Sequence, residues 1–323
     1  MSVKGYQMAK KMSSFLFFFL SIVLVFTPIK SENSYVTRAA IGVVAALVGT
    51  TLAGLAYKYF MGKKDDVSMI ITPKKSVTPL STAAVKPPHY SGFEFFWQVP
   101  DDVVNGRVET KYTSSCFSQW YPSEFTAFAI DFKTAEHFMM YFKALHFAYG
   151  LNKDTNDAIA TAIIASTRTG KEAKDWGKKV NLVPADWDKF SELYVYAGNM
   201  EKFSQNEGLK NYLLGTGNKF LAEASPYDKV WGIGLKINDT NAKIRTDWQG
   251  INKLGYILMM VRSELQKSDP FRPATLYNDN IDNFIIDVKN PQSKMMIYWK
   301  TLSDQYKNNF GVSSDWKLLP GKK

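Results

Sequence analysis

The chain has 323 residues, of which 46% are hydrophobic, and it carries a net charge of +10. Residues 1–90 hold 11 Lys/Arg against 3 Asp/Glu, whereas the remaining residues hold 29 against 27. A broad nucleic-acid-binding surface on the larger part of the chain is therefore not indicated. The single cysteine, Cys116, excludes an intramolecular disulfide, and a total of three histidines argues against a multi-histidine metal site.

Two apolar segments open the chain. A lysine-containing start precedes an apolar run from Phe15 to Phe26, which is typical of a signal peptide or an uncleaved signal anchor over residues 1–31. Residues 39–60 form a longer apolar segment with no charged side chain before Lys58. We expect a transmembrane helix there, with a buried soluble helix as the alternative. Residues 61–91 have the Pro-, Ser-, Thr- and Lys-rich composition of a linker.

Positive charge is distributed unevenly around the second apolar segment. Arg38 precedes it, whereas Lys58, Lys63 and Lys64 lie at or beyond its end. Cytoplasmic flanks of membrane spans carry the excess of basic residues. We therefore expect a single-pass membrane protein whose C-terminal domain is cytosolic.

A globular domain is expected over residues 92–266. Short strands are predicted at 92–97, 125–132 and 220–224, and a helix at Thr134–Tyr149 with Thr134 as its N-cap. Further helices are predicted at 154–167, 170–180, 185–205, 207–214 and 250–265. A C-terminal extension, residues 267–323, adds a strand-like stretch at 284–288 and a helix near 291–306. The predicted fold is mostly α with a small β-sheet.

Common cofactor and metal motifs are missing from the sequence. Gly232 and Gly234 lack the third glycine of a dinucleotide fingerprint, and Gly170 opens no phosphate-binding loop. His137 and His146 are nine residues apart on one helix, so they point to opposite faces and cannot share a metal. We therefore expect neither a metal nor a cofactor.

The predicted helix at 134–149 carries a charged pair on an otherwise apolar face. Glu136 and Lys143 are seven residues apart, which separates them by about 20° around the helix axis. Partial desolvation there would displace their pKa values toward neutral pH, as in a catalytic site. A solvated helix face or a structural ion pair is the alternative reading.

Several segments between residues 92 and 265 resemble, in order and spacing, the NADAR (NAD and ADP-ribose) family. They are FSQWYPS at 117–123, TAEHFMMYFKA at 134–144, KFSQN at 202–206, EASPYDKVWGIGL at 223–235, and WQGINKLG at 248–255. The family includes an N-glycosidase that acts on early riboflavin-pathway intermediates. The resemblance implies a helical N-glycosidase domain that cleaves a base–ribose bond in a small phosphorylated substrate.

The resemblance also suggests catalytic roles. Glu136 would stabilise the cationic sugar and activate water. Lys143, in its neutral form, would attack the sugar carbon to form an imine, or would instead pair with a phosphate or carboxylate. Asp228 would orient the ribose hydroxyls or share acid–base work, with a turn cap as the equal alternative.

Substrate-binding roles fall on residues of the same motifs. Trp231 and Trp120 would stack on the base, with core packing as the alternative. Ser225 and Glu223 would shape the loop around the base, and Asn252 would contribute from the closing helix.

Two residues depart from the family pattern and leave the substrate open. Gln119 stands where asparagine is more frequent, and His137 stands where glutamine is usual, beside Glu136. Hydrolysis of a phosphoribosylamino-pyrimidine is the leading expectation. The alternatives are removal of ADP-ribose from a modified nucleobase, although a long polynucleotide is not favoured, and a noncatalytic membrane-tethered sensor of an ADP-ribose-like ligand.

Overall fold

The computed structural model describes residues 90–319, apart from residues 108, 110 and 149–152. The predicted signal segment, the transmembrane helix and all but the last two residues of the linker lie outside this range. None of the helices that the structure describes is long and apolar enough to cross a membrane. The described residues all belong to one compact unit.

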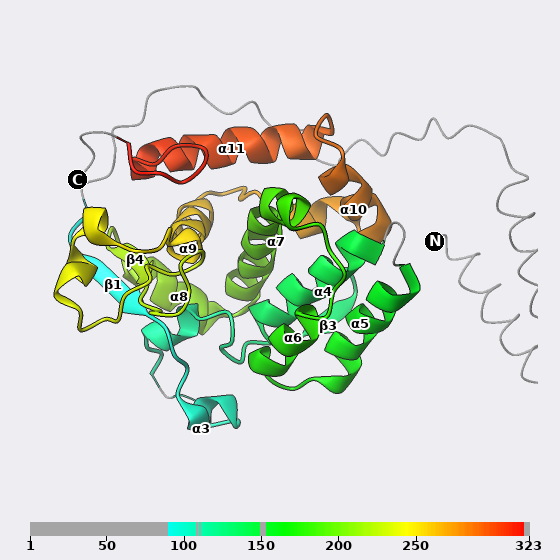
Figure 1. The fold of residues 1–323 in the computed structure, drawn as a ribbon, viewed down its shortest axis with the longest axis horizontal. Helices are drawn as coiled ribbons and strands as arrows, with labels where there is room; N and C mark the ends of the chain where they lie inside the picture. Colours follow the sequence, from blue (N-terminus) through cyan, green and yellow to red (C-terminus); the bar gives the residue numbers. More distant parts are fainter. Residues whose placement is uncertain (1–89, 108, 110, 149–152, 320–323) are drawn as a thin grey trace, which may run out of the picture. The chain divides into compact units, whose positions relative to one another are not determined.

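Helices dominate the described part of the chain, as predicted (Figure 1). The central helix α7 packs against α4 on one side and α9 on the other. The principal helices are α4 (Ala135–Ala148), α5 (Lys153–Ser166), α6 (Gly170–Gly177), α7 (Pro184–Gln205), α8 (Glu207–Gly215) and α9 (Lys253–Glu264). Short helical elements are α3 (Asp101–Val104), η1 (Ser114–Phe117), η2 (Thr240–Lys243), η3 (Arg245–Asp247) and η4 (Pro273–Tyr277).

One two-stranded sheet places the loop that carries the predicted binding motif. Strand β1 (Phe93–Phe96) pairs in parallel with β4 (Phe220–Glu223), so that Phe96 lies opposite Glu223. Helix α9 covers this sheet. Glu223 therefore ends a buried strand, and the loop after it starts from a fixed point.

The segment predicted as one strand over 125–132 is in fact a hairpin. Strands β2 (Phe125–Ala127) and β3 (Ile130–Phe132) pair antiparallel around Phe128 and Ala129, whose φ angles are +53° and +56°. Such turns usually carry Asn or Gly, and neither residue is present here to mark the turn. The Phe128 ring packs against the rings of Phe142 and Phe284, and this burial compensates for the strained backbone.

Helix α4 begins where the sequence predicts. The hydroxyl oxygen of Thr134 accepts a hydrogen bond from the backbone N–H of His137 at 3.3 Å, as an N-cap does. On the buried side, Phe138 lies against Gly198 of α7, where an added Cβ would come within 2.8 Å of its ring. The two helices approach closely at this glycine, which holds the first turn of α4 against the core.

The C-terminal extension is helical. The strand-like prediction at 284–288 is wrong, because these residues belong to α10 (Ile281–Lys289). Phe284, Ile285 and Val288 are buried at helical spacing, a pattern that a short apolar run does not distinguish from a strand. The helix predicted near 291–306 is confirmed as α11 (Lys294–Phe310).

The extension closes the core over α9 and α7. The ring of Tyr256 in α9 lies 5.3 Å from Phe310 and 5.0 Å from Trp316. The buried hydroxyl of Tyr196 in α7 donates to the carbonyl oxygen of Phe271. Residues 267–319 are thus packed into the same core as the helices that precede them.

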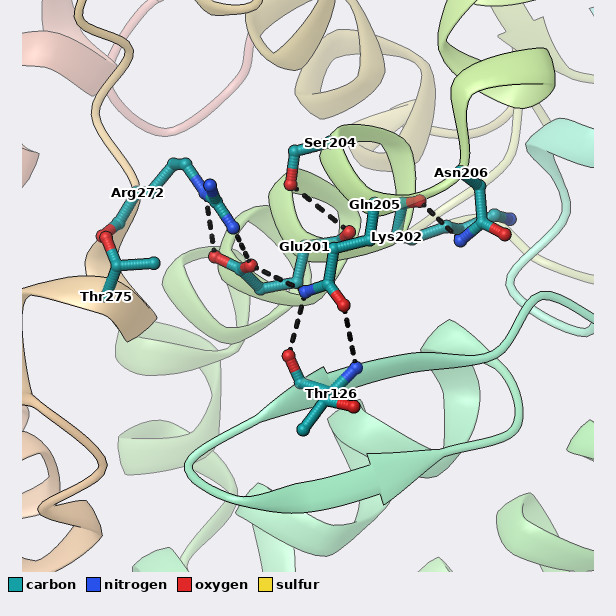
Figure 2. A network of polar contacts seen from close by, with 8 residues as sticks. All are labelled: Thr126, Glu201, Lys202, Ser204, Gln205, Asn206, Arg272 and Thr275. Carbon is teal, nitrogen blue, oxygen red and sulfur yellow. Dashed lines mark hydrogen bonds and ion pairs between the residues drawn. The ribbon is translucent and has the colours of Figure 1, made fainter.

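The C-terminal end of α7 joins the hairpin to the extension (Figure 2). The Gln205 side chain pairs with the backbone of Thr126, accepting its N–H at 2.9 Å and donating to its carbonyl at 2.8 Å. It also donates to Glu201, which forms an ion pair with Arg272 of the extension. The motif at 202–206 is therefore a structural junction.

Candidate active site

Glu136 lies in the first turn of α4, and only 5% of it is exposed. Its backbone N–H donates to the carbonyl oxygen of Gln119 at 3.0 Å, which ties the loop before the hairpin to the helix. Burial raises the pKa of the Glu136 carboxyl to about 7, and the charge of Asp228 adds to the increase, while Lys174 and Lys143 oppose it. This carboxyl can exchange a proton near neutral pH.

A second buried carboxyl belongs to Glu223 at the end of β4. Its pKa is raised to about 8, mainly by burial and also by the charges of Asp228 and Glu136, while Lys174 opposes the increase. Its Oε2 atom is buried without a hydrogen-bond partner. Two carboxyl groups that repel each other's charge thus share one site, the arrangement that separates an acid from a base.

The loop at 225–231 is folded around two side chains. The Ser225 hydroxyl accepts the backbone N–H of Asp228 at 3.2 Å, and Asp228 Oδ1 accepts the N–H groups of Val230 and Trp231 at 2.9 and 2.8 Å. Asp228 therefore caps the turn, as one of its two predicted roles requires. Its carboxylate charge still reaches both Glu136 and Glu223, so the cap does not remove it from the site.

Lys143 lies farther along α4, with its ammonium group turned toward α6. Its Nζ atom donates to the carbonyl oxygen of Gly177 at 3.0 Å and lies 5.7 Å from the Trp187 ring centroid. Burial lowers the pKa of Lys143, an effect that Glu136 opposes and Lys174 reinforces. The predicted nucleophile is thus close enough to interact with Glu136, but a helix carbonyl holds it.

Lys174 in α6 is a site residue that the sequence analysis missed. Its charge acts on Glu136, Glu223 and Lys143, and it lowers the Glu136 pKa more than Lys143 does. It reaches the site because α6 approaches α4 closely at Gly177, where an added Cβ would come within 2.1 Å of the Met140 sulfur. No local pattern in the sequence marks such a long-range approach.

The two predicted aromatic platforms differ in access. Trp120 is 36% exposed, lies against the backbone of Gly170, and has the Lys174 ammonium 5.8 Å from its ring centroid. Trp231 is half-buried and packs against the core. Trp120 is therefore the more open ring, and stacking on a base stays a prediction for both.

Asn252, predicted to contribute to substrate binding, is directed into the protein and bonded to β4. Its side chain is fully buried, with Oδ1 accepting the N–H of Glu223 and Nδ2 donating to the carbonyl of Leu221, both at 3.0 Å. It fixes the end of β4 and hence the Glu223 backbone. Asn252 is a positioning residue whose polar atoms are directed into the protein.

His137 is hydrogen-bonded to Thr134 at the start of α4, and the charges that act on its ring are those of Lys133 and Glu172. Its Nδ1 atom shares a 2.8 Å hydrogen bond with the Thr134 hydroxyl. Burial, aided by the charge of Lys133, lowers its pKa to about 4, so the ring is neutral at neutral pH. Any influence of this residue on the site passes through the packing of α4.

Cys116 is a buried free thiol. Burial raises its pKa to about 12, so the thiol stays protonated. Within the described ranges, no group of three or more His, Cys, Asp or Glu side chains is arranged to hold a metal ion.

Fold and site together define a mostly helical domain that holds a pair of buried carboxyl groups beside lysine and tryptophan side chains. The family model of the NADAR domain matches residues 96–266, slightly more than half of the chain. The chain belongs to the NADAR family.

Relatives of this chain include proteins with named activities. It is 38% identical over 157 residues to an N-glycosidase of Acanthamoeba polyphaga mimivirus, an alignment that covers 47% of this chain and 88% of the viral protein. It is 26% identical over 206 residues to a riboflavin biosynthesis protein of Vibrio vulnificus, covering 63% of this chain and 48% of that protein. The NMR structure of the E. coli protein YbiA aligns with a TM-score of 0.38 at 19% identity, covering 55% and 88% of the two chains.

Proposed function

We propose that this protein is an N-glycosidase that hydrolyses the base–ribose bond of a small phosphorylated nucleotide-like substrate. The observation that carries the proposal is the buried carboxyl of Glu136, whose pKa of about 7 makes it a proton-transfer group at neutral pH. A second buried carboxyl, that of Glu223, supplies the partner that such hydrolysis requires.

The two carboxyl groups divide the chemistry between them. Glu136, with the lower pKa, is the ionised group that stabilises the cationic sugar and accepts a proton from the attacking water. Glu223, protonated at neutral pH, donates its proton to the departing base. The carbon–nitrogen bond breaks, a carbon–oxygen bond forms, and the two carboxyl groups exchange protonation states until solvent restores them.

Lysine side chains are assigned supporting roles in this proposal. The positive charge of Lys174 moderates the repulsion between Glu136 and Glu223 and keeps Glu136 able to ionise. Lys143, whose pKa is lowered by burial, is the candidate for an alternative first step. In that step its neutral amine displaces the base, which leaves with the Glu223 proton, and the sugar ring opens to give an imine on the lysine. Water then hydrolyses the imine, which releases the sugar and restores the lysine. Borohydride trapping during turnover would detect that adduct, and full activity of Lys143→Ala without an adduct would remove the imine step.

A phosphoribosylamino-pyrimidine of the riboflavin pathway is the proposed substrate. Support comes from the names of two relatives, an N-glycosidase and a riboflavin biosynthesis protein, and from the near-neutral charge of residues 91–323. A polynucleotide carrying ADP-ribose would require a basic surface for its phosphates, so the smaller substrate is favoured.

The test compares Glu136→Gln with the parent protein, both as the full chain purified in mild detergent. Glu124→Gln is the matched control, because Glu124 is exposed at the start of the hairpin. Each protein is incubated with the phosphoribosylamino-pyrimidine and, separately, with ADP-ribosylated DNA, and released base is measured by mass spectrometry. We expect a loss of about 100-fold or more for Glu136→Gln alone.

Other outcomes of this assay have definite meanings. Release from ADP-ribosylated DNA alone would replace the proposed substrate. Binding of substrate without release by the parent protein would favour a ligand sensor. Parental turnover by Glu136→Gln would refute the assignment of this carboxyl.

The site is proposed to face the cytosol, held at a membrane by the apolar segment at 39–60. The distribution of basic residues around that segment supports this orientation. Protease added to intact membranes from the non-cytosolic side should leave residues 92–323 undigested, and their digestion would reverse the orientation.

A further inference from the structure

Gln119 carries a side-chain amide that nothing in the described structure satisfies. The residue is only 9% exposed, and neither its Oε1 nor its Nε2 atom has a hydrogen-bond partner. Other buried amides are at least half bonded: Asn199, for example, still donates to a backbone carbonyl. A buried amide with both ends unpaired is unfavourable unless something else supplies the partners.

The backbone around this amide is firmly held. The buried ammonium of Lys202 donates to the carbonyl oxygens of Cys116 at 2.7 Å and Ser118 at 3.0 Å. The Ser118 hydroxyl accepts the N–H of Trp120 at 3.2 Å. The unpaired amide therefore extends from a firmly held backbone, as a recognition group requires.

Its neighbours are the residues of the candidate active site. The carbonyl oxygen of Gln119 accepts the N–H of Glu136 at 3.0 Å. The next residue, Trp120, is partly exposed and has Lys174 5.8 Å from its ring centroid. Glu223, which interacts with Glu136 and Lys174, has a buried unpaired oxygen of its own. Two segments that meet at the candidate active site thus each carry a buried polar side-chain atom without a partner.

We propose that Gln119 is a specificity-determining residue that pairs with the base of the substrate, and that it selects a base with a ring N–H beside a carbonyl. This inference rests on the proposed N-glycosidase function. A primary amide offers a donor next to an acceptor. A cyclic –NH–CO– edge presents the complementary pair, so both ends of the amide are satisfied by two parallel hydrogen bonds.

Discrimination follows from the burial of the amide. A site built to hydrogen-bond a substrate rejects an analogue that lacks the group, because its own polar atoms then stay unpaired. Methylation of the ring nitrogen removes the donor and adds bulk at the same point. The parent protein should therefore cleave the oxo-pyrimidine substrate about 100-fold or more faster, in kcat/KM, than its N-methyl derivative.

The experiment crosses the substrate change with Gln119→Met, which has similar length and no amide. The full-length variant should lose activity on the oxo-pyrimidine and show a ratio near one between the two substrates. Gln292→Met, at an exposed glutamine, should keep the parental ratio. A merely structural Gln119 would lower activity on both substrates equally and preserve the ratio, which would overturn the proposal.

Two further measurements keep the test decisive. If Gln119→Met does not fold, equal cleavage of the two substrates by the parent protein overturns the proposal without any variant. Calorimetry with the free base and its N-methyl derivative separates this inference from the proposed function. If neither substrate is cleaved, the proposed glycosidase function is refuted. Tighter binding of the unmethylated base would still support base recognition by Gln119. Equal binding of the two bases would reject base recognition by Gln119.

Discussion

The Glu136→Gln substitution should stabilise the protein at alkaline pH while it removes activity. The pKa of this carboxyl is about 7 in the folded protein, against 4.5 for an ordinary glutamate. The folded state therefore binds the proton more tightly than the unfolded chain. The stability that this contributes is fully present below pH 4.5 and is lost as the pH rises through 7.

The size of the effect follows from the same two values. The difference between about 7 and 4.5 corresponds to about 3 kcal/mol, at roughly 1.4 kcal/mol for each pKa unit. Glutamine carries no charge to bury, so its stability should not change with pH at this position. The free energy of unfolding of Glu136→Gln minus that of the parent should therefore be about 2–3 kcal/mol larger at pH 8 than at pH 4.5. Loss of the Glu136 charge also relieves repulsion on Glu223.

Urea unfolding at pH 4.5 and pH 8 measures this difference. All eight tryptophans lie at position 97 or later, so tryptophan fluorescence reports only on the globular part of the chain. The exposed Glu124→Gln should behave like the parent at both pH values. A Glu136→Gln protein with the same stability advantage, or none, at both pH values would refute the argument that burial raises this pKa.

Three further predictions concern the same site and its support. Activity, measured as kcat/KM, should follow a bell-shaped pH profile. It should rise near pH 7 as Glu136 ionises and fall near pH 8 as Glu223 loses its proton. A flat profile from pH 6 to 9 would contradict this prediction. Lys174→Met should move the rising limb to higher pH, because the lysine lowers the Glu136 pKa, and an unmoved limb would exclude the lysine from the site. Lys202→Met should remove the ammonium that pairs with the carbonyl oxygen of Cys116, while the carbonyl oxygen of Ser118 keeps the N–H of Tyr121. We expect the free energy of unfolding to fall by about 1–3 kcal/mol; no measurable loss in urea unfolding would show that these bonds contribute little.

Local pattern predicted much of this fold. Thr134 marks the start of α4, and most helices between residues 135 and 264 lie within a few residues of their predicted bounds. Predictions were wrong where local pattern is ambiguous or silent. The apolar run at 284–288 fits a strand or a helix equally well, and the hairpin turn at Phe128 carries neither Asn nor Gly.

In the candidate site too, motifs mark some residues, whereas the positions of others depend on how the helices pack. Glu136, Glu223 and Asp228 were named from motifs, and the structure brings their charges together. Lys174 was missed because its place depends on how α6 packs on α4. Asn252 was assigned to the substrate because a motif does not show in which direction a side chain points.

Residues 267–319 complete the hydrophobic core of the domain that the family match covers only up to residue 266. The family match ends at residue 266, yet Tyr256 has its aromatic neighbours Phe310 and Trp316 beyond that point. Deleting residues 267–319 would expose the apolar surface of α9 around Tyr256. It would also remove the acceptor of the Tyr196 hydroxyl. A change far from the reaction, in a stretch that family comparison overlooks, can therefore lower cellular abundance of the enzyme with its chemistry intact.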